Sequence, residues 1–345
     1  MMAGDMNAEK MMGYLYELPD QFHSSLELEF DFIEGYRRDY RNIVVTGLGG
    51  SAIGGDILRN YAAKMARLPV VVNRDYHLPA FVGPDTLVLA VSYSGNTEET
   101  LAAYEEAARR GAQIIVVSSG GKLSQYARQN GQGLIQIPSG FVPRAAVGWL
   151  FAPQALLLGE LGLIEGVKEE IREVAAVLKE LRESLKPTVD VPVNQARVIA
   201  GKCRGNIPVI WGTTGVSEVA AQRWKAQINE NAKSPAYYSI FPELNHNEIV
   251  GFEAPADLLQ KQVYIILRDK EDYGRIEKRI DISKAIIRDK VKNTIEVHSR
   301  GQSYLARVFS LIYVGDYASV YLALEYGINP TPVKMIDFLK EQLAR

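Results

Sequence analysis

The sequence predicts an α/β fold built from two doubly wound parallel sheets. The chain has 345 residues, which corresponds to two domains at about 150 residues per domain. Short apolar runs alternate with longer stretches of helical periodicity, and runs that are apolar throughout are typical of strands buried on both faces of a parallel sheet. This alternation occurs once in each half of the chain, with an offset between the halves that indicates an internal duplication.

The first half contains five predicted strands and two predicted helices. The strands cover residues 42–46, 69–73, 86–92, 113–118 and 133–138. Helical patterns cover residues 54–66 and 97–110. Strand, helix and strand in repetition predict a sheet with helices on its faces.

The second half repeats this organisation after a helical connector. Residues 167–185 have apolar side chains at the i, i+3, i+4 and i+7 positions of an amphipathic helix, and a proline-containing linker follows. The remaining predicted elements are strands at 207–212, 236–241, 262–268 and 293–298 and helices at 216–231, 302–326 and 333–343. The predicted divisions are an N-terminal helical extension (1–35), a first domain (36–155), a connector and linker (156–192) and a second domain with the C-terminal helices (193–345).

Composition excludes several classes of function. The 39 Lys and Arg residues are balanced by 41 Asp and Glu residues, so the basic excess of a nucleic-acid-binding protein is missing. Cys203 is the one cysteine in the sequence, which fits a reducing compartment. The most apolar segment, residues 145–159, is interrupted by Gly148 and Pro153 and is shorter than the roughly 20 residues that cross a bilayer. We therefore expect a cytoplasmic protein without nucleic-acid or membrane partners.

A glycine-rich loop, TGLGGSAIGG at residues 46–55, directly follows a predicted strand and leads into a helix. Glycines allow the backbone to approach an anion, and a helix N-terminus adds unpaired N–H groups. The same pattern fits a dinucleotide-binding loop, although Asn73 stands where that site needs an acidic residue at the end of the second strand. A tight turn that only packs helix against strand is the third interpretation.

A second loop, VSYSGNTEET at residues 91–100, favours a phosphate. It offers the hydroxyls of Ser92, Ser94 and Thr97, which suit the several acceptor oxygens of a phosphate monoester. Asn96 is expected to cap the following helix, with Glu99 completing a capping box. Two such loops on neighbouring strands indicate a phosphosugar site, with simple helix caps as the alternative.

These loops resemble the sugar isomerase (SIS) domain. The whole chain resembles the bifunctional phosphoglucose/phosphomannose isomerase family, which has two SIS domains in about this length. Five further segments carry the resemblance: PRAA at 143–146, NENAK at 229–233, NHN at 245–247, GINP at 327–330 and IDFLK at 336–340. The resemblance covers residues 40–345 and implies two SIS domains related by duplication.

The resemblance implies a metal-independent aldose–ketose isomerase that interconverts glucose 6-phosphate, and also mannose 6-phosphate, with fructose 6-phosphate through a cis-enediolate. Glu230 would be the base, and His246 would assist ring opening from the other subunit of a homodimer. Arg144 would stabilise the enediolate, and Lys340 would contact the ring oxygen or the developing charge. The phosphate would be held by Gly50, Ser51, Ser92, Ser94 and Thr97.

One position departs from the pattern of some family members. They carry a hydroxyl, associated with mannose 6-phosphate, just before the terminal helix. This chain has Val333 there, with Thr331 two residues earlier. This difference bears on the strength of the mannose 6-phosphate activity and not on the isomerase class.

Without the resemblance, these residues also have structural interpretations. Glu230 and Lys340 fit solvated helix faces, and His246 fits an ordinary polar loop. Arg144 lies in an apolar segment, where a charge needs an ion-pair partner or an anionic ligand. No spacing of His, Cys, Asp and Glu suggests a metal site, so we expect neither metal nor cofactor.

Two other functions remain open at this point. A sugar-phosphate-sensing SIS regulatory protein would keep both loops but would need no catalytic residues, and no basic patch or helix-turn-helix accompanies the loops here. A dinucleotide-dependent oxidoreductase would use the first glycine loop alone. A glucosamine 6-phosphate synthase is disfavoured because the N-terminal region has no cysteine for a glutaminase.

Overall fold

The computed structural model describes residues 5–343, and the first four and last two residues of the predicted terminal segments lie outside this part. The chain divides into two compact units. The first unit consists of Glu17–Lys179 with Gly301–Ala306. The second unit consists of the remaining described residues, mainly Glu180–Arg300 and the chain from Arg307 onward.

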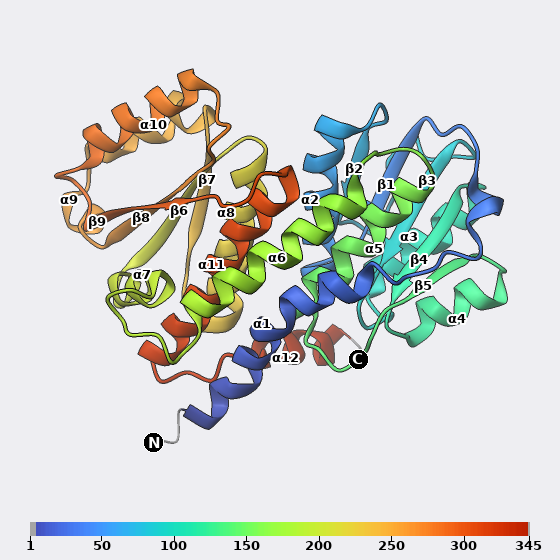
Figure 1. Cartoon of the computed structure of the whole chain (residues 1–345), viewed down its shortest axis with the longest axis horizontal. Helices are drawn as coiled ribbons and strands as arrows, with labels where there is room; N and C mark the ends of the chain where they lie inside the picture. Colours follow the sequence, from blue (N-terminus) through green and yellow to red (C-terminus); the bar gives the residue numbers. More distant parts are fainter. Residues whose placement is uncertain (1–4, 344–345) are drawn as a thin grey trace. The chain divides into compact units, whose positions relative to one another are not determined.

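The first unit contains a five-stranded parallel sheet with the order β2-β1-β3-β4-β5 (Figure 1). Its strands are β1 (Asn42–Thr46), β2 (Val70–Asn73), β3 (Thr86–Val91), β4 (Gln113–Ser118) and β5 (Gly133–Gln136). Every residue of the central strand β3 is buried. This confirms the predicted strands, which are apolar throughout because both faces of the sheet are covered.

Helices cover both faces of this sheet. On one face, a hydrophobic cluster joins the strands to α3 (Glu98–Arg109) and α4 (Gly121–Gln129). On the other face, α2 (Gly50–Met65) packs so closely that a Cβ at Gly55 would lie 2.8 Å from the Val45 side chain. Helix α5 (Val147–Glu160) packs in turn on α2. The first unit therefore has the predicted doubly wound arrangement.

The second unit contains a four-stranded parallel sheet with the order β7-β6-β8-β9. The strands are β6 (Ile207–Thr213), β7 (Tyr237–Phe241), β8 (Gln262–Arg268) and β9 (Asn293–His298). This order repeats β2-β1-β3-β4 of the first sheet, as an internal duplication predicts. The repeat places β6 and β8 in the positions that β1 and β3 hold in the first unit.

Helices also flank the second sheet. A hydrophobic cluster joins one face to α10 (Gly274–Ile287), whereas α8 (Val216–Gln227) packs on β6 from the other side. Helix α11 (Tyr304–Glu325) contacts α8 through a buried ion pair between Arg223 and Asp316, with a nitrogen–oxygen distance of 2.8 Å. Since both partners are almost fully buried, this pair fixes the two helices against each other.

The remaining helices are α1 (Asp5–Ser25), α6 (Val167–Leu185), α7 (Gln195–Cys203), α9 (Ala256–Leu259) and α12 (Lys334–Leu343). Two predicted helix boundaries are wrong. Helix α2 begins at Gly50 rather than at residue 54, because the sharp turn at Gly49, with φ of 54°, leads directly into the helix. The helix predicted over 216–231 is α-helical only to Gln227 and continues as a π-helical turn, Ile228–Ala232.

Helix α11 is the one described helix with the length and apolar composition to cross a membrane. Of its most apolar 18-residue stretch, 89% is buried within the structure. Such burial is what a core helix of a globular domain shows.

Candidate functional site

The two predicted phosphate loops lie side by side in the first unit. They follow the carboxyl ends of β1 and β3, which are neighbours in the sheet. The Tyr93 N–H donates to the Ser51 hydroxyl at 3.3 Å and so joins the loops directly. The chain winds in opposite directions from these two strands, and ligands of open α/β sheets bind at such a point.

Hydroxyls organise the second loop. The hydroxyls of Ser92 and Thr97 hydrogen-bond to each other at 2.9 Å, and the Gly95 N–H donates to Ser92 at 3.1 Å. Ser94 accepts the Asn96 N–H at 3.3 Å and is exposed. Ser92 is almost fully buried. The loop thus holds three hydroxyls in a compact, internally bonded turn ahead of α3.

The predicted capping box is wrong. Thr97, not Asn96, occupies the N-cap position of α3, and its side chain makes no hydrogen bond to the helix end. The Asn96 side chain instead accepts the Lys122 N–H at 3.1 Å, at the start of α4. The first turn of α3 therefore lacks a side-chain cap, so its N–H groups stay available to an anion.

Close backbone approach brings Arg144 to the same place. A Cβ at Gly50 would lie 2.8 Å from the Pro143 carbonyl oxygen and 3.2 Å from the Arg144 nitrogen. The Arg144 side chain, in a 3-10 turn at Pro143–Ala145, is buried. Gly50, Ser51 and the backbone of Arg144 thus lie close together beyond the carboxyl end of β1.

In the second unit, Glu230 lies in the π-helical turn that follows α8. Buried hydrogen bonds fix its neighbours: Asn231 donates to the Ser319 hydroxyl of α11 at 2.9 Å, and Asn229 donates to the Ser234 carbonyl at 2.8 Å. Glu230 itself is half-buried. π-Helical turns occur frequently at functional sites, and this one places Glu230 between two residues that are held by hydrogen bonds.

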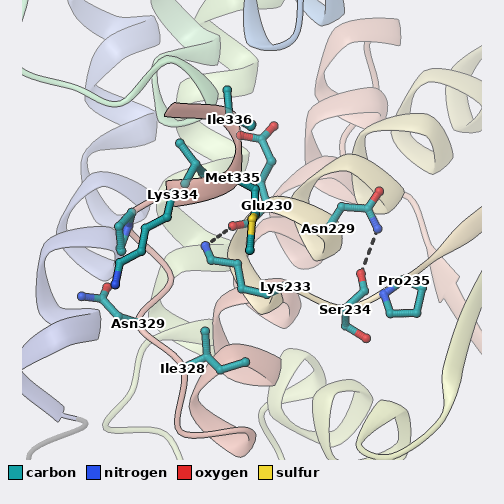
Figure 2. A pocket seen from close by; sticks show the side chains of 12 residues that line it. Asn229, Glu230, Lys233, Ser234, Pro235, Ile328, Asn329, Lys334, Met335 and Ile336 are labelled. Atoms are coloured by element: carbon teal, nitrogen blue, oxygen red, sulfur yellow. Dashed lines mark hydrogen bonds between the residues drawn. The ribbon is translucent and has the colours of Figure 1, made fainter. Parts of the chain in front are cut away.

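Glu230 lines a cavity of about 640 Å³, shown in Figure 2. Its walls come from the π-helical turn and from the segment that leads into α12: Asn229, Glu230, Lys233, Ser234, Pro235, Ile328, Asn329, Pro332, Val333, Lys334, Met335 and Ile336. The Lys233 amine bridges the two walls, because it donates to the Glu230 carbonyl and, at 3.0 Å, to the Pro330 carbonyl. Val333, predicted to influence substrate choice, therefore shares a cavity with the predicted base.

His246 and Lys340 are not among the residues that line this cavity. His246 is exposed at the end of a 3-10 turn, Glu243–His246. Lys340 is exposed on α12, none of whose described residues is buried. Sequence reasoning gave no role to Lys233, although the NENAK segment contains it and could have drawn attention to it.

The loop that carries His246 is fixed on both sides of the histidine. Asn245 donates to the Ser283 hydroxyl of α10 at 2.7 Å, and the Trp211 indole N–H of β6 donates to the Glu248 carboxylate at 2.8 Å. Trp211 is fully buried. His246 is thus presented to solvent from a loop anchored to the sheet and to a helix.

Replacing Glu248 with Ala leaves the indole N–H of Trp211 buried without its acceptor. We expect Glu248→Ala to lower the free energy of unfolding by about 1–3 kcal/mol. The matched variant Glu248→Gln keeps an acceptor oxygen and should lose much less, as measured by chemical denaturation. Equal losses in both variants would show that the charge of Glu248, and not the hydrogen bond, stabilises the loop.

Among residues 5–343, no three His, Cys, Asp or Glu side chains gather in an arrangement that could hold a metal ion. The described chain offers two adjoining loops with the hydroxyls of Ser51, Ser92, Ser94 and Thr97, which we call the cradle, together with a buried arginine and a carboxylate that lines a cavity.

Comparisons with known proteins cover nearly the whole chain. Residues 38–135 match the SIS domain model, and residues 192–343 match that of the bacterial phospho-glucose isomerase C-terminal SIS domain. The chain is 49% identical over 335 residues, 97% of its length and 99% of the relative's, to a bifunctional phosphoglucose/phosphomannose isomerase from Caldicellulosiruptor bescii. It is 38% identical, with the same coverage of both chains, to the protein of that name from Aquifex aeolicus.

The fold comparison agrees. The C-terminal domain of glucosamine-fructose-6-phosphate aminotransferase from Francisella tularensis has a TM-score of 0.72 and 13% identity, covering 94% of this chain and 99% of that one. At this identity the likeness shows the fold, two SIS domains, and nothing about activity. The full-length identity to the curated relatives goes further: the chain belongs to the bifunctional phosphoglucose/phosphomannose isomerase family.

Proposed function

We propose that this protein interconverts glucose 6-phosphate and mannose 6-phosphate with fructose 6-phosphate. The observation that carries the proposal is the 49% identity along 97% of the chain to a relative named for these two activities. The hydroxyl-rich cradle and the Glu230 carboxylate supply the two chemical functions that such a reaction needs. The free, buried Cys203 suits our further proposal that the protein works in the cytoplasm.

In the proposed mechanism, the first unit holds the substrate phosphate. The donors are the hydroxyls of Ser51, Ser92, Ser94 and Thr97 together with backbone N–H groups at Gly50 and at the uncapped start of α3. Because the phosphate lies far from the reacting carbons, its binding energy positions the sugar for proton transfer.

Glu230 would carry out the proton transfer. Its carboxylate takes the proton from C2 of the open-chain aldose, which gives a cis-enediolate, and returns it to C1 to give the ketose. The hydroxyl proton moves from O2 to O1 in the same sequence, so no redox partner is required. Glucose and mannose 6-phosphates differ only at C2, and this stereocentre is lost in the shared intermediate.

Three other residues would complete the chemistry. Arg144 would stabilise the negative charge of the enediolate, since a buried guanidinium offers directed donors to an oxyanion. His246 would assist opening of the pyranose ring. Lys340 would contact the ring oxygen.

The test is conversion of fructose 6-phosphate by purified protein, with EDTA present and nucleotides absent, while resolving the two aldose products. Formation of both glucose and mannose 6-phosphates supports the proposal. Absence of both products, with fructose 6-phosphate still raising the melting temperature, would favour a sugar-phosphate sensor instead.

Val333 provides a specificity prediction. Its side chain lines the Glu230 cavity and carries no hydroxyl. We expect Val333→Thr to raise the share of mannose 6-phosphate in the product several-fold, because one added hydrogen bond stabilises the bound state by about 1 kcal/mol. The aldose product ratio measures this effect. Val333→Ala, which creates space without a hydroxyl, is the control, and an equal change in both variants would assign the effect to volume.

We also propose a homodimer in which His246 serves the partner's active site. Its exposed position on an anchored loop supports this proposal. Mixing inactive Glu230→Gln and His246→Ala proteins should restore part of the turnover, since a mixed dimer would contain one site with both native residues. No recovery after verified subunit exchange would contradict a shared site.

A further inference from the structure

The second unit contains a counterpart of the first phosphate loop. Strand β6 ends at Thr213 as β1 ends at Thr46. Each following helix has a glycine at its N-cap with positive φ, Gly215 at 110° and Gly49 at 54°. Two residues after this glycine comes a buried serine, Ser217 in the second unit and Ser51 in the first.

The counterpart of the second loop has the opposite chemistry. Strand β8 pairs with β6 as β3 pairs with β1, so the segment after β8 corresponds to the one that carries Ser92, Ser94 and Thr97. The segment after β8 instead carries three carboxylates, Asp269, Glu271 and Asp272. The loop after β3 is therefore rich in hydroxyl donors, whereas its counterpart after β8 is rich in carboxylates.

One of these carboxylates, Asp272, accepts a hydrogen bond from each of the two counterpart loops. The Thr213 hydroxyl donates to Asp272 Oδ1 at 2.6 Å, and the Asp269 N–H donates to Asp272 Oδ2 at 3.0 Å. The Ser217 hydroxyl accepts the Thr213 N–H at 2.7 Å and hydrogen-bonds its hydroxyl at 2.9 Å. A carboxylate of the chain itself is thus bonded between the counterparts of the two phosphate loops, at the residue that corresponds to Thr46.

The buried positive charge beside this segment is already paired. The buried Arg307 guanidinium pairs with Asp269 at 3.0 Å and with Glu271 at 2.9 Å, so two carboxylates already match its charge. Burial raises the pKa of Asp272, and the hydrogen bond from Thr213 opposes that rise. A phosphate monoester placed beside the segment after β8 would be repelled by its carboxylates. It would also find the Thr213 hydroxyl already donating to Asp272.

We infer that the Asp272 carboxylate prevents phosphate from binding at the counterpart loops of the second unit. Each chain therefore binds phosphate only in the first unit. The expectation of one phosphate site in the native chain rests on the proposed function. The closing role of Asp272 does not, because it concerns the second unit alone.

The test is equilibrium dialysis of the full-length chain against labelled inorganic phosphate. The native protein should bind one phosphate per chain. Asp272→Ser, which puts a hydroxyl in place of the carboxylate, should bind two, with the added site at least about tenfold tighter than any second binding to the native chain. Glu277→Gln, which removes an exposed carboxylate from α10, is the matched charge control and should still bind one.

Each outcome decides the inference. Two sites in the native chain, or no added site in Asp272→Ser, would overturn it. No site in the native chain with one in Asp272→Ser would contradict phosphate binding by the first cradle and still support the closing role. If Asp272→Ser unfolds, recovery of its fold by inorganic phosphate, and not by chloride of equal ionic strength, supports the inference; failure of that recovery overturns it.

Discussion

Glu230→Gln is expected to lower kcat for fructose 6-phosphate by about 10²–10⁴-fold, the usual contribution of a positioned general base. The amide keeps the size and shape of the side chain but cannot accept the proton that must leave C1 of the ketose. The fixed neighbours of Glu230, with Asn231 bonded to Ser319 and Asn229 to Ser234, should hold the backbone in place. A loss of turnover would then report chemistry and not collapse of the turn.

Two further measurements distinguish a loss of chemistry from a collapse of the π-helical turn. Phosphate binding by Glu230→Gln should stay near native, because the cradle hydroxyls belong to the first unit. Exchange of the C1 hydrogen of fructose 6-phosphate with deuterated water should fall in parallel with turnover. Glu277→Gln should leave both rates unchanged, and near-native turnover in Glu230→Gln would remove this residue from the mechanism.

Most of the fold was predictable because its signals are local. Strands β4, β8 and β9 begin and end at the predicted residues, since turn residues bound each apolar run. The sequence does not predict the point at which α8 gives way to a π-helical turn. That change accompanies tertiary contacts such as the Asn231–Ser319 hydrogen bond to α11, which leave no trace in the periodicity of α8.

The candidate site also has features that the local sequence predicts and features that depend on long-range contacts. The adjacency of the two loops could be predicted because Ser51 and Ser92 follow neighbouring strands, and parallel strands bring their carboxyl ends together. The predicted capping role of Asn96 was wrong because the Asn96 side chain accepts from a long-range donor, the Lys122 N–H, and not from a donor at the start of α3. The role of Asp272 could not be predicted either, because the hydrogen bond that it accepts from Thr213 joins residues 59 positions apart.

Arg144→Met is expected to lower kcat by about 10²–10³-fold, the typical effect of removing one oxyanion donor. The charge is buried, and the guanidinium sits on a segment that contacts Gly50 of the cradle. Methionine keeps an unbranched apolar stem, so the packing around residue 144 should survive while the charge disappears. Arg144→Lys should recover part of the rate, because it restores the charge without the planar fork of donors.

The division of the loss between kcat and KM decides what Arg144 does. Stabilisation of the enediolate lowers kcat and kcat/KM together, since that charge exists only after the C2 proton has left. Binding of the substrate phosphate would instead raise KM and leave kcat near native, because the phosphate is present throughout. Arg109→Met, which changes an exposed arginine of the same unit, should alter neither constant. A loss confined to KM would therefore assign Arg144 to the phosphate cradle and leave the enediolate without its proposed counter-charge.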